Sequence, residues 1–145
     1  MPFFFSLQTA IRNAGGTWVD RDVVDDDGLV SSRKPAACDA VVEAITSAGG
    51  EAIAAPCNVA ERSQLEALVD RTLEHWGRLD ILVCNAAVNP YFGPMARMPD
   101  EAYERIMNTN VRSNFWLCNL AAARMAANGG GSITIVSSIG ANQGS

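Results

Sequence analysis

Two groups of side chains that could do chemistry each follow a short apolar run. Asn85-Ala86-Ala87 comes directly after the run 81–84, and Ser138 comes shortly after the run 133–136. Small residues at the carboxyl end of a strand would let a flat ring approach the backbone, because ligands bind beyond these ends in open parallel sheets. A tight turn would explain the first group equally well, and a cap or turn serine would explain the second.

A third group is basic. Ser31-Ser32-Arg33-Lys34 follows Leu29-Val30 and contains no carboxylate. Where a Rossmann-type strand ends, an acidic side chain accepts bonds from the ribose hydroxyls of NAD, whereas a basic one pairs with the 2′-phosphate of NADP. If the run 29–30 ends a strand of this kind, Arg33 and Lys34 favour NADP over NAD. A solvated basic turn is the alternative.

The elements that must position these groups alternate along the chain from about residue 29. Apolar runs expected to be strands alternate with amphipathic stretches expected to be helices, and glycines follow several of the helices. The predicted strands end at 29–30 and cover 52–55, 81–84 and 133–136, and the predicted helices cover 35–48, 65–76 and 99–127. This order predicts an α/β fold with a doubly wound, Rossmann-like parallel sheet, here a truncated three-layer sandwich.

Residues 1–28 do not continue this alternation, and we interpret them as an acidic segment separate from a partial dinucleotide-binding domain at 29–145. A calcium-binding loop starting at Asp20 would need glycine at its sixth position and glutamate at its twelfth. Those positions hold Asp25 and Ser31, so a solvated acidic loop is the preferred interpretation.

Composition narrows the function further. The net charge of −5 argues against nucleic-acid binding. The sequence contains no run of 18 apolar residues, so it predicts no membrane-spanning helix. The four cysteines form no C-x-x-C pair and have no histidine cluster near them, so we expect no metal site and free thiols in a reducing cytoplasm.

Three segments together resemble a known family. Asp80-Ile81-Leu82-Val83-Cys84-Asn85-Ala86-Ala87, Asn110-Val111 and Ser132-Ile133-Thr134-Ile135-Val136-Ser137-Ser138 occur in the order typical of short-chain dehydrogenases/reductases. Asn85-Ala86-Ala87 is similar to the end of the family's Asn-Asn-Ala-Gly motif, with Cys84 in place of its first asparagine. The segments 31–35 and 85–90 further resemble the NADP-dependent carbonyl reductase and retinol dehydrogenase branch.

The resemblance implies roles for individual residues. Ser138 matches the catalytic serine that polarises the substrate carbonyl, and Asn110 matches the asparagine that holds a proton-relay water. Asn58-Val59 resembles an Asp-Val pair that contacts adenine, and an amide can replace that carboxylate because it both donates and accepts. The implied cofactor-binding set is Ser32, Arg33, Lys34, Asn58, Val59, Asn85, Ala86 and Ala87. The implied reaction moves a hydride between NADP(H) and a small carbonyl or alcohol.

Two parts of the family pattern are missing from the sequence. There is no Thr-Gly-x-x-x-Gly-x-Gly turn to hold the pyrophosphate, and no Tyr-x-x-x-Lys follows Ser138. We therefore expect a chain that is incomplete at both ends and has little activity alone, with a homo-oligomer expected for the complete enzyme only. A non-catalytic remnant that acts as an interaction module is the alternative.

Overall fold

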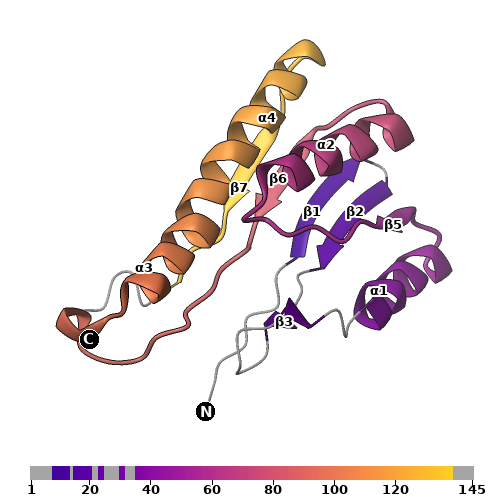
Figure 1. The fold of residues 1–145 in the computed structure, drawn as a ribbon. Coiled ribbons are helices and arrows are strands. Elements are labelled where there is room, and N and C mark those ends of the chain that lie inside the picture. The colour runs from indigo at the N-terminus through magenta and orange to yellow at the C-terminus, as the bar shows by residue number, and fades with distance from the viewer. Residues whose placement is uncertain (1–7, 14, 21–22, 25–29, 32–34, 139–145) are drawn as a thin grey trace.

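The computed structural model describes residues 8–13, 15–20, 23–24, 30–31 and 35–138. Strands and helices alternate through most of this chain, and a short 3₁₀ helix precedes the longest helical stretch (Figure 1). The elements are β1 (Gln8–Asn13), β2 (Gly15–Asp20), β3 (Val23–Val24), β4 (Val30–Ser31), α1 (Pro35–Ser47), β5 (Ala52–Ala54), α2 (Arg62–Trp76), β6 (Ile81–Cys84), a 3₁₀ helix (Met95–Arg97), α3 (Asp100–Ile106), a π-helical segment (Met107–Arg112), α4 (Ser113–Ala127) and β7 (Ser132–Ile135).

The helices begin and end close to where the sequence predicts. Helix α1 starts at Pro35, whose fixed φ suits a first helical turn. Helix α2 ends at Gly77, which adopts a left-handed φ of 74° and donates its N–H to the carbonyl of Leu73. A residue with a side chain would be strained there, so Gly77 sets the end of α2.

The strands follow the sequence prediction after residue 50 and depart from it before. β6 and β7 pair in parallel, and β5 pairs in parallel with β2. The prediction that Leu29-Val30 ends a strand of the main sheet is wrong for Val30, because β4 pairs antiparallel with β3 in a separate two-stranded ribbon. The strand beside β5 is instead β2, which carries the strand formers Thr17, Trp18 and Val19.

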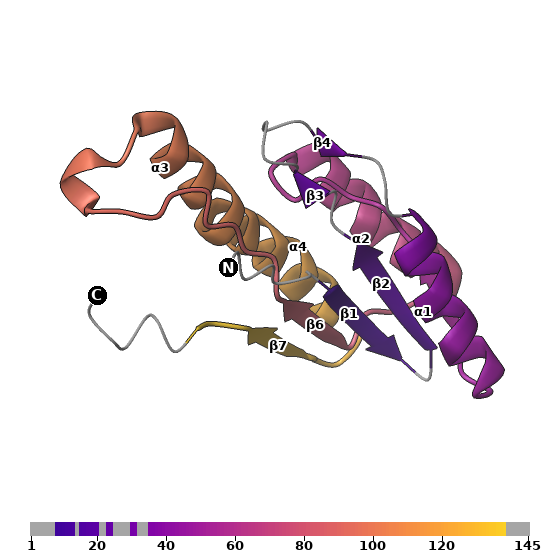
Figure 2. The same ribbon diagram turned by 90° about the horizontal axis from the view of Figure 1, so that it is seen from below.

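Strand β1 runs against its neighbours. It pairs antiparallel with β2 and lies between β2 and β6, as the two views of the ribbon show (Figures 1 and 2). The described parts of the first 28 residues form strands, whereas Asp22, Asp25, Asp26 and Asp27, on which the interpretation of an acidic loop rests, lie outside the described residues. Gly15 and Gly16 begin β2, where they are the register partners of Asn13 and Arg12 at the end of β1.

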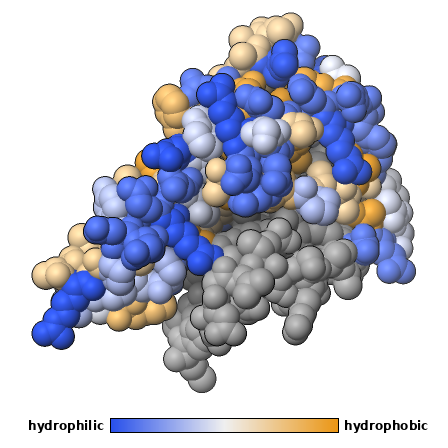
Figure 3. Space-filling model, viewed as in Figure 1, coloured by the Kyte–Doolittle hydropathy of each residue, from blue (hydrophilic) through white to orange (hydrophobic). Residues whose placement is uncertain are grey.

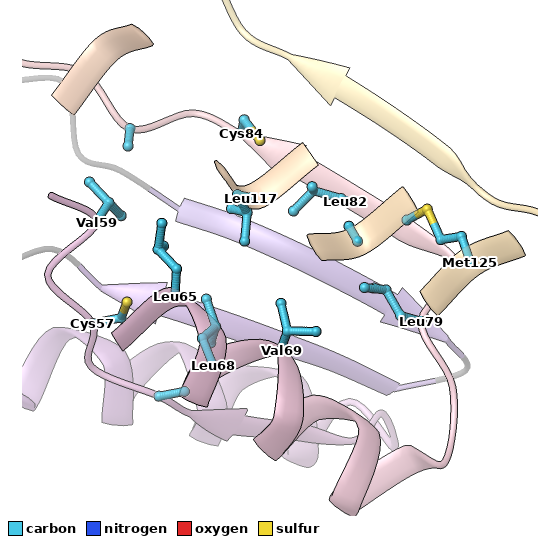
Figure 4. Packing of buried hydrophobic residues seen from close by; sticks show 13 residues of the cluster. Cys57, Val59, Leu65, Leu68, Val69, Leu79, Leu82, Cys84, Leu117 and Met125 are labelled. Carbon is cyan, nitrogen blue, oxygen red and sulfur yellow. The ribbon is translucent and has the colours of Figure 1, made fainter. Parts of the chain in front are cut away.

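The core lies between β6 and the helices α2 and α4 (Figure 4). Leu82 is 0% exposed and Cys84 is buried, whereas Ile81 on the alternate face is 36% exposed. A continuous apolar strand is typical of a parallel sheet that is covered on both faces, and the exposure of Ile81 departs from that pattern. The buried cluster consists of Ala55, Cys57, Val59, Leu65, Leu68, Val69, Leu79, Leu82, Cys84, Ala86, Leu117, Ala121 and Met125.

Outside this core, the face that α2 and α4 present is mostly hydrophilic with smaller apolar areas (Figure 3). Val111 and Phe115 are apolar side chains exposed along the long helical stretch. β7 is exposed at all of its residues, including Ile133 and Ile135. Among the described residues, no helix is long and apolar enough to cross a membrane.

Candidate functional site

The loops after β6 and β7 leave the same edge of the sheet. Cys84 is the register partner of Ile135, and the N–H of Val136 donates to the carbonyl of Cys84 at 2.8 Å. Asn85 therefore follows one strand at the level where Val136 follows the other, and Ser138 comes two residues later in an exposed position. The pairing brings together the two segments that the sequence analysis singled out first.

Asn110 joins the long helical stretch to the loop after β6. Its side-chain Oδ1 accepts the N–H of Val88 at 2.8 Å, and its Nδ2 donates to the carbonyl of Val88 at 2.9 Å. The two bonds satisfy both backbone groups of one residue across 22 positions of sequence. Asn110 is half-buried, and it has the hydrogen-bond partner that a buried amide requires.

The helix phase around Asn110 differs from the sequence expectation. Regular α-helical spacing would place Tyr103 and Val111 on the same face as the half-buried Asn110, but each of these two side chains is 52% exposed. A π-helical segment covers Met107–Arg112, so α-helical spacing does not hold across it. The predicted helix from 99 to 127 is therefore present, with its middle turns widened.

The loop between β5 and α2 contains Asn58 and Val59. Val59 is 6% exposed and belongs to the same buried cluster as Ala86 of the β6 loop. The N–H of Asn58 donates to Oε1 of Gln64 at 2.7 Å, and Oδ1 of Asn58 accepts the N–H of Ala60 at 3.1 Å. Gln64 was not among the predicted site residues, and the capping-box pattern does not find it, because Gln64 accepts from Asn58 rather than from the N-cap residue Glu61.

The remaining predicted cofactor residues divide into two sets. Asn85 is half-buried, Ala86 is buried and Ala87 is exposed, so small side chains do line the start of the β6 loop. Ser32, Arg33 and Lys34 lie outside the described residues, and their predicted role stays a prediction. No group of His, Cys, Asp or Glu side chains within the described ranges could hold a metal ion.

Two buried thiols adjoin these loops. Burial raises the pKa of Cys57 to about 12. Burial also raises the pKa of Cys84 to about 12, with a smaller contribution from a hydrogen bond and charge interaction with Cys118. Both thiols are therefore protonated at neutral pH, and a thiol is a poor nucleophile in that state.

These thiols make the stability of the folded chain decrease with rising pH in the alkaline range. Their folded pKa of about 12 exceeds the ordinary value of 9.0, so the folded state binds more protons than the unfolded state between these values. The stabilisation is complete below pH 9 and decreases as the pH rises towards 12. We expect urea unfolding to show a shallower alkaline loss for Cys57→Val than for the unaltered chain. Equal alkaline losses would contradict the protection of Cys57.

Comparison with known proteins identifies the family of this chain. The sequence model of the family described as "short chain dehydrogenase" matches residues 24–145. The chain belongs to this family. The match covers the β6 loop, Asn110 and Ser138, and it begins a few residues before the domain start at 29 that the sequence suggested.

Similar proteins support the same family assignment. Dehydrogenase/reductase SDR family member 4 of Bos taurus is 36% identical over 138 residues, which are 94% of this chain and 50% of the relative. A solved 7α-hydroxysteroid dehydrogenase, in complex with NADH and 7-oxo glycochenodeoxycholic acid, is 32% identical with a TM-score of 0.74. That match covers 89% of this chain and 45% of the other.

A hydroxysteroid dehydrogenase from Escherichia coli is also similar, with 37% identity and a TM-score of 0.66 over 71% of this chain and 43% of the other. The predicted Rossmann-like α/β fold is confirmed by these likenesses. The chain spans about half the length of the curated relatives it matches.

Proposed function

We propose that this chain is part of an oxidoreductase that transfers a hydride between NADP(H) and a carbonyl or alcohol substrate. The observation that supports this best is the pair of bonds between Asn110 and Val88. They fix the loop that begins with Asn85-Ala86-Ala87 at the sheet edge where Ser138 also emerges. One edge of the sheet therefore has the hydroxyl group of Ser138, the amide of Asn110 and a loop that can accommodate a flat ring. Such a set of groups suits the reduction of a carbonyl group.

The described residues fit the nicotinamide end of such a cofactor. Ala87 is exposed and carries no more than a methyl group, so a flat ring could lie against the backbone there. We propose that Asn85, Ala86 and Ala87 hold this end and that Asn58 and Val59 contact the adenine. When bound, the cofactor supplies or accepts the hydride.

The other residues of the site orient the substrate and handle protons. We propose that the hydroxyl of Ser138 donates a hydrogen bond to the carbonyl oxygen of the substrate, where negative charge develops during reduction. Asn110 uses one donor and one acceptor on Val88. An amide has two donors and two lone pairs, so Asn110 retains capacity to bind the water that the family resemblance implies.

The cofactor preference rests on Ser32, Arg33 and Lys34. A guanidinium group beside the 2′-phosphate favours NADP, although the similar 7α-hydroxysteroid dehydrogenase was solved with NADH. We further propose the carbonyl reductase and retinol dehydrogenase branch, a cytoplasmic location, and a homo-oligomer for the complete enzyme. The domain boundary near residue 29 belongs to the same proposal.

A titration followed by NMR tests this function. We expect NADPH to shift the amide signals of Asn85, Ala86 and Ala87 with a dissociation constant of about a millimolar, since the sequence contains no Thr-Gly-x-x-x-Gly-x-Gly turn to hold the pyrophosphate. NADH should shift them less at equal concentration. Absence of shifts at these positions with either nucleotide would contradict the proposal and favour the non-catalytic interaction module.

Replacing Arg33 with alanine separates the 2′-phosphate from the rest of the cofactor. Loss of a bond to a charged group costs about 1.5–3 kcal/mol, so NADPH binding should fall to the level of NADH while NADH binding is unchanged. Arg62→Ala is the matched control, because Arg62 is exposed and paired with Glu66. Equal weakening of both nucleotides by Arg33→Ala would show that Arg33 does not select the cofactor.

A further inference from the structure

The π-helical segment changes the hydrogen-bond donors of the backbone carbonyls around Asn110. The N–H of Ser113 donates to the carbonyl of Asn108, five residues back, instead of to Thr109. The hydroxyl of Ser113 donates to the carbonyl of Thr109, and Nδ2 of Asn114 donates to the carbonyl of Asn110 at 2.8 Å. Side chains therefore bind two consecutive carbonyls of the widened turn.

These side-chain bonds stand next to the contact that reaches the loop. Asn110 is bound at its carbonyl by Asn114 and through its own side chain to Val88. A widened turn rotates the residues inside it relative to an α-helix, so whatever holds the π geometry also sets the direction of the Asn110 side chain. Asn114 is half-buried, which limits the water that could replace its amide.

We propose that Asn114 is a positioning residue, whose amide holds the carbonyl of Asn110 so that the Asn110 side chain meets Val88. Through Val88, it sets the loop that begins at Asn85. The consequence for cofactor binding rests on the function proposed above, whereas the effect on Val88 does not.

The chain contains a matched control for this bond. Nδ2 of Asn119 donates to the carbonyl of Phe115 at 2.7 Å, with the same spacing of four residues, on an exposed turn of α4 outside the π-helical segment. Replacing either asparagine with alanine removes one such bond and increases helix propensity. A general effect on the helix would therefore be the same in both variants.

Hydrogen exchange of the Val88 amide in the full 145-residue chain tests the proposal, because this N–H is bound to Asn110 Oδ1. We expect Asn114→Ala to accelerate its exchange roughly fivefold to tenfold, the factor expected from one net hydrogen bond. Asn119→Ala should leave it unchanged. Asn114→Ser should restore slow exchange, because a serine hydroxyl can bind the carbonyl four residues back, as Ser113 does.

Unchanged exchange at Val88 in Asn114→Ala overturns the proposal, and so does equal acceleration in Asn119→Ala. If the Asn114→Ala chain does not fold, the Asn114→Ser chain tests the proposal instead. Fast exchange at Val88 in a folded Asn114→Ser chain also overturns the proposal. A nucleotide titration of the same samples is read separately. Accelerated exchange at Val88 without any nucleotide binding would support the role of Asn114 and contradict the proposed function.

Discussion

Replacing Leu82 with alanine is expected to lower the free energy of unfolding by about 2–5 kcal/mol. Leu82 is 0% exposed in the centre of β6, and it belongs to the cluster that joins this strand to α2 and α4. The loss has two parts. The variant loses the hydrophobic free energy of burying the removed carbon atoms, and a cavity remains between the strand and the helices. Urea unfolding followed by circular dichroism measures it.

Ile81→Ala is the control for this prediction, because Ile81 lies on the same strand and is 36% exposed. Its truncation removes less buried surface and should cost clearly less than the truncation of Leu82. Equal losses at the two positions would mean that the second face of β6 is covered in solution, contrary to the exposure of Ile81.

Replacing Asn110 with leucine should also destabilise the chain strongly. The substitution keeps the branched shape of the side chain but leaves the N–H and the carbonyl of Val88 without the partners they have now. Each unsatisfied group costs about 1–3 kcal/mol when it remains away from water. We expect a loss of unfolding free energy by urea titration that approaches the loss for Leu82→Ala.

The corresponding change at Asn119 provides the comparison, because that amide makes a single exposed bond to its own helix. Asn119→Leu should change stability little. A small effect of Asn110→Leu would show that water replaces the side chain on Val88, and the structural part of the proposed site would then be wrong.

The predictions that hold rest on local signals in the sequence. Gly77 ends α2 because a left-handed φ favours glycine, and the apolar run 81–84 forms β6 because its buried residues alternate beneath the helices. Such signals act over a few residues. They predict where an element lies without fixing its partners, which is why the antiparallel direction of β1 could not be predicted from the apolar pattern.

In the candidate site, too, local features could be predicted from the sequence and distant partners could not. Asn110 could be singled out from its type and its place along the chain, and the structure bonds it to the loop after β6, whereas the role of Ser138 stays a prediction. The partner of Asn110 could not be predicted, because the N–H and carbonyl of Val88 are backbone groups that any residue supplies. The π-helical segment was also missed, since periodicity at α-helical spacing assumes regular turns throughout.

The exposure of β7 has a consequence for the chain at high concentration. Among the described strands β7 pairs with β6 alone, so no described strand pairs with its outer side. Ile133 and Ile135 add apolar surface to β7. An open strand of this kind is a template, because each added chain can pair with it through main-chain bonds whatever its side chains. Self-association would then begin at this strand, and its rate would rise more steeply than in proportion to the protein concentration.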